Sequence, residues 1–350
     1  MRYNGKRSLT ITGFAAMLAA AAALTACSSS STSSGGGTSS TSPTSSSSSA
    51  AATTGSAGST TTASSGLTID MVTHASPGDS FWTVVQNGAE AAAKAMGVKL
   101  DYAASGGNVQ KQVQLINSAA AGKPAGIITT LADPTAFTPA IKAAEAAGVP
   151  VFTINSGTGV YTTTGSLGHV GEDASVAGVG VGKQFDTLNV KHVLCVIQER
   201  GNVDLENYCA GIKSAFSGQY TSMYVNGTTD LTGTQQQIQA ELASDPSIDA
   251  VFTLDAPIAP LAVAAAAALS RKVTVATWTL SPQVLTDIES GQIAFAEDQQ
   301  PYLQGYLSVV TAFLYATDGI RPSTAVLTGP NFVTKANAAQ VVALSAKGMR

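Results

Sequence analysis

The chain has 350 residues, of which 11% are charged, 44% are hydrophobic and 34 are glycine, and its net charge is −4. A weakly acidic chain of this kind lacks the basic character of a nucleic-acid-binding protein. Three His and three Cys are too few and too scattered for a zinc finger or a catalytic zinc cluster, so we expect no metal and no other cofactor.

The N-terminus has the features of a targeting segment. Met1–Arg7 contains three cations, and Leu9–Ala26 is apolar and rich in alanine. This order predicts a signal peptide over residues 1–26. Leu24-Thr25-Ala26-Cys27 resembles the lipobox of bacterial lipoproteins, in which cleavage precedes the cysteine and its thiol receives a diacylglycerol. The resemblance implies a lipid anchor on Cys27, whereas the alternatives are an ordinary secretory signal and an uncleaved helix.

Residues 27–65 consist almost entirely of Ser, Thr, Gly and Ala. Such a segment buries too little apolar surface to offset the entropy of ordering, so it predicts a flexible tether. No later segment has the ~18 consecutive apolar residues of a spanning helix, and the alanine run Ala262–Leu269 is too short. We therefore expect the body of the protein to contact the membrane through the lipid anchor alone.

The body, Gly66–Arg350, is close to the size at which one core divides into two, about 250–300 residues. Short Val- and Ile-rich runs alternate with Ala-rich segments of helical spacing. The predicted strands are Leu67–His74, Val98–Ala103, Gly126–Leu131 and Val149–Asn155, and the predicted helices are Ser80–Gly97, Asn108–Gly122 and Thr135–Gly148. Gly97, Gly122 and Gly148 are each expected to end a helix in the left-handed conformation.

The same alternation resumes after Gly171. The predicted helices are Asp173–Leu188, Leu205–Phe216, Thr234–Ala243, Ile258–Leu269 and Pro282–Ser290, and the predicted strands are His192–Gln198, Ser222–Asn226, Ile248–Leu254 and Val273–Trp278. Repeated strand–helix units imply right-handed crossovers and parallel sheets. The sequence therefore predicts an α/β protein with two Rossmann-like lobes, each a parallel sheet flanked by helices.

Residues just past the predicted strands share a chemical character. In open parallel sheets ligands bind at the carboxyl ends of strands. The segments there are rich in aromatic and short hydrogen-bonding side chains: His74 to Trp82, Asn155-Ser156-Gly157, Gln198-Glu199-Arg200-Gly201-Asn202, Asp255-Ala256-Pro257, Trp278-Thr279 and Asp298-Gln299-Gln300. A sugar ring has apolar C–H faces and a rim of hydroxyls, which such side chains match. The pattern favours a site for a sugar or polyol.

Three segments carry a family resemblance. They are Phe81–Glu90 (FWTVVQNGAE), Val149–Asn155 (VPVFTIN) and Gln299–Gly305 (QQPYLQG). In this order they resemble the first helix, the fourth strand and the hinge-and-helix motif of the ribose- and galactose-type periplasmic binding proteins, the type I solute-binding proteins. The resemblance extends from Gly66 to about Val333.

The resemblance implies an architecture and a role. The two lobes that it implies are residues 66–170 with 300–328 and residues 171–299 with 329–350, and a multi-strand hinge joins them. It implies a monomer on the outer face of the cytoplasmic membrane. That monomer captures a monosaccharide or polyol between its lobes and delivers it to an ABC permease and its ATPase.

The family's ligand-binding positions transfer to this chain residue by residue. An Asp-Arg pair of the family falls on Asn155 and Ser156, and a family arginine falls near Glu206. Loss of both arginines argues against ribose, because arginine anchors hydroxyls bidentately. It points to another monosaccharide, a polyol, or a ligand with positive character that Asp79 and Asp255 would meet. The candidate ligand-binding residues are Asp79, Phe81, Trp82, Asn155, Asn202, Glu206, Asp255, Trp278, Thr279 and Gln299.

Each candidate also has a purely structural interpretation. Phe81 and Trp82 are alternatively core residues, although adjacent residues on a helix face different directions, which places at least one outside the core. Asp79 and Asp255 are alternatively helix N-caps. Asn155 is alternatively a turn residue and Gln299 a hinge spacer. The glycines of residues 178–182 lie inside a helical segment and are weak evidence for a dinucleotide loop.

Cys195 and Cys209 remain once Cys27 is assigned to lipid. Outside the cytoplasm the pair forms either a disulfide, closing a loop of about 15 residues worth roughly 3 kcal/mol, or two buried free thiols.

Other functional classes fit the sequence less well. The chain has no Gly-x-Ser-x-Gly elbow, Walker loop or evident nucleophile–base pair, so we do not expect an enzyme. A sugar-responsive repressor of this fold requires a basic helix-turn-helix where the signal and tether stand. An envelope receptor for a signalling molecule, such as a furanosyl autoinducer, remains the alternative to solute uptake.

Overall fold

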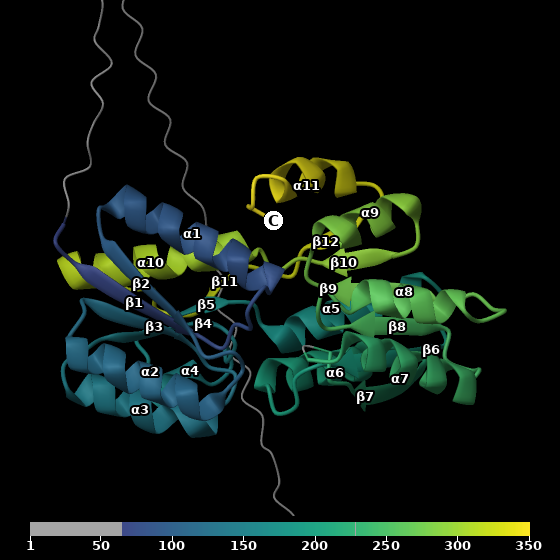
Figure 1. The fold of residues 1–350 in the computed structure, drawn as a ribbon, viewed down its shortest axis with the longest axis horizontal. Helices are drawn as coiled ribbons and strands as arrows, with labels where there is room; N and C mark the ends of the chain where they lie inside the picture. Colours follow the sequence, from purple (N-terminus) through teal and green to yellow (C-terminus); the bar gives the residue numbers. More distant parts are fainter. Residues whose placement is uncertain (1–64, 228) are drawn as a thin grey trace, which may run out of the picture. The chain divides into compact units, whose positions relative to one another are not determined.

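The computed structural model describes residues 65–227 and 229–350. The predicted signal peptide 1–26, Cys27 and all but the last residue of the predicted tether lie outside the described residues. The described part forms two α/β lobes (Figure 1), each built on its own six-stranded sheet.

The first lobe has the strand order β11-β5-β4-β3-β1-β2, with every neighbouring pair parallel. Its strands are β1 Thr68–Thr73, β2 Lys99–Ala104, β3 Gly126–Thr130, β4 Val151–Asn155, β5 His169–Gly171 and β11 Val326–Leu327. Its helices are α1 Ser80–Met96, α2 Val109–Gly122, α3 Pro134–Ala146, the short α4 Tyr161–Thr164 and α10 Pro301–Asp318. Helices α1 and α10 cover one face of the sheet, and α2 and α3 cover the other.

The second lobe has the strand order β12-β10-β9-β8-β6-β7, in which only the β10–β12 pair is antiparallel. Its strands are β6 His192–Ile197, β7 Gln219–Tyr224, β8 Ala250–Thr253, β9 Thr274–Trp278, β10 Phe295–Glu297 and β12 Phe332–Thr334. Its helices are α5 Ala174–Thr187, α6 Val203–Ala215, α7 Leu231–Ser244, α8 Ala259–Ala267, α9 Pro282–Ser290 and α11 Ala338–Ser345. Equivalent strands occupy equivalent places in the two sheets, which confirms the predicted two-lobed α/β fold.

The chain crosses between the lobes three times. It leaves the first sheet after β5, leaves the second after β10, and returns to the second after β11. The crossing segments are 172–173, 298–300 and 328–331. Because all three pass from one lobe to the other, they form the hinge between the lobes.

Close helix contacts depend on glycine. A Cβ on Gly305 of α10 would lie 1.9 Å from the carbonyl oxygen of Val85 in α1. A Cβ on Gly178 of α5 would lie 2.1 Å from the carbonyl oxygen of Tyr208 in α6. Gly178 and Gly182 are therefore explained by packing against α6, and the glycines of residues 178–182 lie within α5 rather than in a phosphate-binding loop.

The structure corrects several boundaries. Gly97 and Gly148 are left-handed as predicted, but Gly122 is the last residue of α2 and the left-handed residue is Lys123, with φ of 50°. Strand β7 begins at Gln219, three residues before its predicted start. Strands β5, β10, β11 and β12 have only two or three residues each, too few for a periodic pattern.

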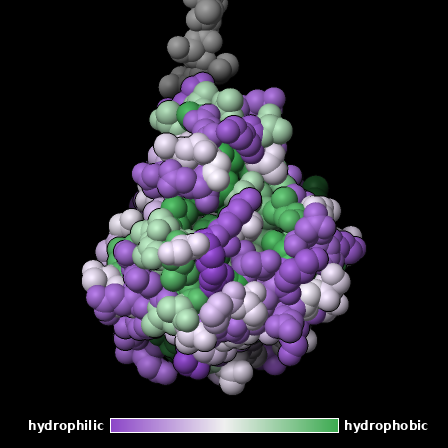
Figure 2. All heavy atoms as spheres, turned by 90° about the vertical axis from the view of Figure 1, so that its right-hand side faces the viewer, coloured by the Kyte–Doolittle hydropathy of each residue, from purple (hydrophilic) through white to green (hydrophobic). Residues whose placement is uncertain are grey.

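The surface of the second lobe is mixed in character. On the face shown in Figure 2, hydrophilic side chains are interspersed with smaller apolar areas. Within the described ranges 65–227 and 229–350, no helix has both the length and the apolar character that a membrane span requires.

Candidate ligand-binding site

A cleft of about 340 Å³ lies between the lobes, where strands of both sheets end. Segments that follow β1, β2, β4, β6, β7, β8 and β9, the first turns of α1 and α6, and the hinge supply its walls. The lining residues are His74, Ser76, Asp79, Phe81, Trp82, Gly106, Gly107, Asn155, Ser156, Gln198, Glu199, Arg200, Asn202, Asp204, Leu205, Asn226, Thr229, Leu254, Asp255, Trp278, Thr279 and Gln299. Nine of the ten candidate residues therefore meet in one cleft, and Glu206 is the exception.

Aromatic rings from the first lobe form one wall. Asp79 caps α1 by accepting a hydrogen bond from the Phe81 backbone N–H at 2.9 Å, which starts the helix with two aromatic residues beside the cleft. The Phe81 and Trp82 rings meet edge to face at 5.1 Å, and the His74 ring lies 4.8 Å from that of Trp82. Both Phe81 and Trp82 are less than 10% exposed and also pack in the core. Phe81 and Trp82 therefore pack in the core and also line the cleft, so the structure is compatible with both interpretations of these residues.

Polar residues at three strand ends adopt left-handed backbone conformations. Asn155 follows β4 with φ of 65°, Thr279 follows β9 with φ of 76°, and Gln300 precedes α10 with φ of 56°. Non-glycine residues reach this region at a cost of about 1–3 kcal/mol, and such strain is concentrated at functional sites. Asn155 and Thr279 line the cleft, whereas Gln300 Nε2 donates to the Thr328 carbonyl of the hinge at 2.6 Å.

An amide network joins the first lobe to the hinge. The Asn155 side-chain amide donates to Gln299 Oε1 at 3.0 Å and to Gln304 Oε1 at 3.3 Å, and Gln304 Nε2 also donates to Gln299 Oε1. All three side chains are buried. The network fixes the orientation of Asn155 and Gln299, and with Phe81 these residues line the same cleft.

Carboxyl groups from both lobes face the cleft. Asp79 and Glu199 come from opposite lobes, and Asp255 follows β8 of the second lobe. Burial raises the pKa of Asp79, while hydrogen bonds from the α1 backbone counteract part of the rise. Burial also raises the pKa of Asp255 well above its usual value, and the nearby Asp79 charge raises it further. Close like charges of this kind favour protonation of one partner.

The lobes also touch each other directly. The Val203 backbone N–H at the start of α6 donates to the Ala132 carbonyl at 3.0 Å, and the Gly157 N–H donates to Asp204 Oδ1 at 3.1 Å. Desolvation raises the pKa of Asp204 to about 7. These hydrogen bonds join the start of α6 to the loops after β3 and β4, so the structure has the lobes in contact around the cleft.

A buried acid pair lies at the hinge. Glu172 in the first crossing and Glu297 at the end of β10 are 1% and 0% exposed. The Trp278 indole donates to Glu172 at 3.0 Å, and the Asn331 backbone N–H donates to Glu297 at 2.7 Å. Burial raises the pKa of Glu172 to about 8 and that of Glu297 well above its ordinary range. Trp278 therefore connects the cleft to the hinge acids.

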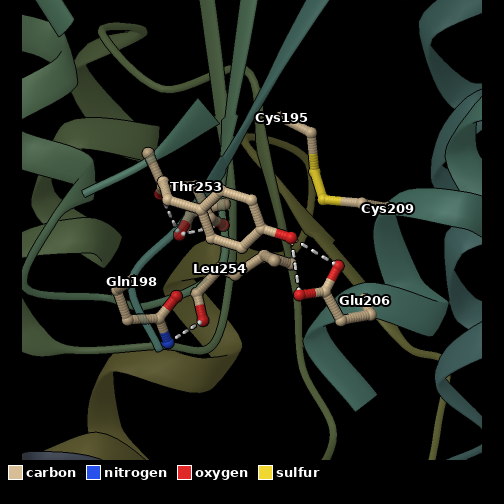
Figure 3. Close-up of a disulfide and its surroundings, with 8 residues drawn as sticks. Cys195, Gln198, Glu206, Cys209, Thr253 and Leu254 are labelled. Carbon is tan, nitrogen blue, oxygen red and sulfur yellow. Dashed lines mark hydrogen bonds between the residues drawn. A yellow bond between two sulfur atoms is a disulfide. The ribbon is translucent and has the colours of Figure 1, made fainter. Parts of the chain in front are cut away.

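Glu206 does not line the cleft. The Tyr224 hydroxyl donates a hydrogen bond that the two oxygens of the Glu206 carboxylate share, at 2.7 and 2.9 Å (Figure 3). Successive residues on a helix are rotated by about 100°, so Glu206 points almost opposite to Asp204, which does face the cleft. The candidate was placed in the correct helix but on the wrong side of it.

Several cleft residues were not among the candidates. Gln198 and Glu199 follow β6, and Gln198 Nε2 donates to the Leu254 carbonyl at 3.1 Å (Figure 3). Gln198 Oε1 is buried and has no hydrogen-bond partner among the described residues. Their position after a strand was the signal available in the sequence, since both stand in the strand-end segment 198–202.

The structure joins Cys195 of β6 and Cys209 of α6 by a disulfide (Figure 3). Both residues are buried, Cys195 within the strand and Cys209 within the helix. The bridge therefore ties β6 to α6, two elements whose ends line the cleft. No group of His, Cys, Asp and Glu suited to holding a metal ion occurs within the described ranges.

Comparisons with known proteins agree with this geometry. A carbohydrate transporter from Acidothermus cellulolyticus, solved with myo-inositol, is 43% identical with a TM-score of 0.79, covering 81% of this chain and all of that one. A periplasmic sugar-binding protein from Legionella pneumophila is 26% identical with a TM-score of 0.70, covering 75% and 99%. The xylose/arabinose-binding protein XylF of Sulfolobus acidocaldarius is 27% identical over 61% of this chain, which spans only 57% of that relative.

Two α/β lobes that face each other across an aromatic and polar cleft, joined by three crossings, define a hinged solute-binding protein. The periplasmic binding protein domain model matches residues 69–319. The chain belongs to the periplasmic binding protein family and has its type I architecture.

Proposed function

We propose that this protein captures a cyclic polyol of the inositol type, or a closely related monosaccharide, and delivers it to an ABC importer. The observation that carries the proposal is the interlobe cleft, lined by aromatic edges and hydrogen-bonding side chains in a chain 43% identical to a transporter solved with myo-inositol.

The chemistry of the cleft fits a single hydroxylated ring. The Phe81 and Trp82 edges offer apolar surface to ring C–H groups, and Asp79, Asn155 and Asp255 offer hydrogen-bond partners to the hydroxyls. A volume of about 340 Å³ is at the small end of the range for ligand pockets, about 300–1,000 Å³. A single ring is therefore favoured over an oligosaccharide.

Capture proceeds by closure of the two lobes about the hinge. A ligand stabilises the closed state only through contacts that the open state lacks. Asp79 and Phe81 on the first lobe and Asp255 on the second provide such contacts, because one ring reaches both sets only when the lobes are together.

The importer role includes attachment to the outer face of the cytoplasmic membrane. Lipidation of Cys27 after cleavage of residues 1–26 supplies the anchor, and residues 27–65 supply the reach to a permease. Labelling cells with a radioactive fatty acid tests this part. Label on the protein that disappears in Cys27→Ala supports lipidation, and equal labelling of both proteins contradicts it.

Isothermal titration calorimetry against myo-inositol, xylose, arabinose, glucose and galactose tests the ligand. Saturable binding of myo-inositol or a related ring is expected, and absence of binding across the panel would refute the proposal. Trp82→Ala should weaken binding by about 1–3 kcal/mol, the scale of a buried aromatic surface. Phe137→Leu provides the control, since Phe137 is buried in the first lobe away from the cleft and should change stability without changing affinity.

A further inference from the structure

The ionisable side chains that line the cleft are mainly acidic. Four carboxyl side chains line it: Asp79 from the first lobe and Glu199, Asp204 and Asp255 from the second. Gln198 adds a carbonyl oxygen that is buried without a hydrogen-bond partner among the described residues. A ligand that satisfies these groups must bring hydrogen-bond donors, which hydroxyl groups are and phosphate or carboxylate oxygens are not.

Positive charge does not balance this set. Among the described residues that line the cleft, Arg200 is the one lysine or arginine. Its guanidinium carbon lies 3.7 Å from the centroid of the Tyr224 ring, so the group stacks on that ring and is exposed to solvent. The His74 imidazole lies 3.9 Å from the Glu199 carboxylate and is held on its other side by Thr130. An anionic ligand would thus meet carboxylates from both lobes without a dedicated cation.

We propose that the cleft selects its ligand by charge: it binds neutral cyclic polyols and excludes derivatives of the same ring that carry a phosphate or a carboxylate. The inference rests on the proposed function and adds a selection rule to it. Closure makes the rule stringent, because it encloses the ligand between Asp79 of the first lobe and Glu199 of the second, and an enclosed site repels a like charge more strongly than water does.

The residues that impose the rule differ in accessibility. The Glu199 side chain is 34% exposed at the edge of the cleft, whereas Asp79 is largely enclosed by protein. Substituting Glu199 by glutamine removes a charge while keeping the shape and the acceptor oxygen. Asp79→Asn does the same on the first lobe and keeps a side chain that can cap α1, so the two variants test the rule at independent positions.

The experiment is a calorimetric comparison of myo-inositol with myo-inositol 1-phosphate on the full chain. The phosphate should bind at least about tenfold more weakly. Glu199→Gln or Asp79→Asn should narrow that ratio at least threefold. Glu90→Gln, an equal charge change on the exposed face of α1, should leave the ratio unchanged. Thermal unfolding of each variant verifies that it is folded.

The outcomes separate the two proposals. Phosphate binding within tenfold of myo-inositol would overturn the charge rule and leave the proposed function standing. The charge rule would also be overturned if the protein excluded the phosphate but both cleft variants kept the same ratio of the two affinities. Shape and not charge would then be responsible for the exclusion. Absence of myo-inositol binding would refute the inositol-type ligand, and the charge rule would fall with it.

Discussion

Asp204 makes the stability of the protein depend on pH in a defined direction. Its side chain is 5% exposed, accepts a hydrogen bond from Gly157 of the other lobe, and has a pKa raised from 3.8 to about 7 by desolvation. A carboxyl group whose pKa is higher in the folded than in the unfolded protein makes the protein less stable as the pH rises. The loss begins near pH 4, where the unfolded chain releases the proton, and is complete slightly above pH 7.

The magnitude follows from the size of the rise. At 1.36 kcal/mol per pKa unit, an increase from 3.8 to about 7 corresponds to about 4 kcal/mol at full ionisation. About 2–3 kcal/mol of this develops between pH 5 and pH 8. For a protein of this size, 1 kcal/mol shifts the melting temperature by about 2–4 °C. Relaxation of the lobes around the ionised group reduces the effect, so these values are upper limits.

Asp204→Asn tests this reasoning because asparagine keeps the shape and the oxygen that accepts from Gly157. The melting temperature of the variant relative to the unsubstituted protein should rise by several degrees between pH 5 and pH 8. Differential scanning calorimetry at the two pH values measures it. Asp318→Asn, an exposed carboxyl at the end of α10, should show no such rise. A difference between variant and parent that is the same at both pH values would refute the argument.

Three further predictions concern packing, the disulfide and the amide network. Gly305→Ala should destabilise the protein by about 1–3 kcal/mol or more, since the new Cβ would lie 1.9 Å from the Val85 carbonyl; an unchanged melting temperature would contradict the described packing. Replacing Cys195 and Cys209 together by serine should lower the free energy of unfolding by roughly 3 kcal/mol, because the disulfide closes a loop with a sequence separation of 14. Denaturant unfolding measures this loss, and equal stability of the parent protein under reducing and oxidising conditions would argue against it. Asn155→Ala should lower the free energy of unfolding by about 1–3 kcal/mol, because the side-chain oxygens of two buried glutamines each lose a hydrogen-bond donor. A variant as stable as the parent protein would show that the amide network does not contribute to stability.

Much of the fold was predictable from local pattern. Strand β6 contains an unbroken apolar run, β3 and β4 are rich in β-branched residues, and helices such as α1 have a polar N-cap and a left-handed glycine at the end. The hinge was not predictable in the same way. Strands β10, β11 and β12 have two or three residues, and each pairs with a partner distant in sequence or in the other half of the chain. Their existence depends on tertiary contacts that leave no periodic signal.

The candidate site was predictable to the level of the segment and less so to the level of the side chain. Asn155 and Asp255 could be identified because each follows a strand, and parallel strands of a sheet end at one edge. Glu206 was misplaced because the start of α6 could not be fixed to within one residue, and an error of two residues reverses the face of a helix. Gln198 stood beside identified residues, but its unpaired oxygen is a property of the folded structure alone.

The contacts between the lobes divide into those that favour closure without a ligand and those that oppose it. The hydrogen bonds from Val203 to Ala132 and from Gly157 to Asp204 favour closure. The approach of Asp79 to Asp255 opposes it, since each charge disfavours the other. A neutral ring with hydroxyl donors reduces the unfavourable interaction of Asp79 with Asp255 and leaves the hydrogen bonds between the lobes intact. Such a ligand therefore stabilises the closed state. The same division explains why a phosphate ester of that ring would add to the opposing contacts instead of relieving them.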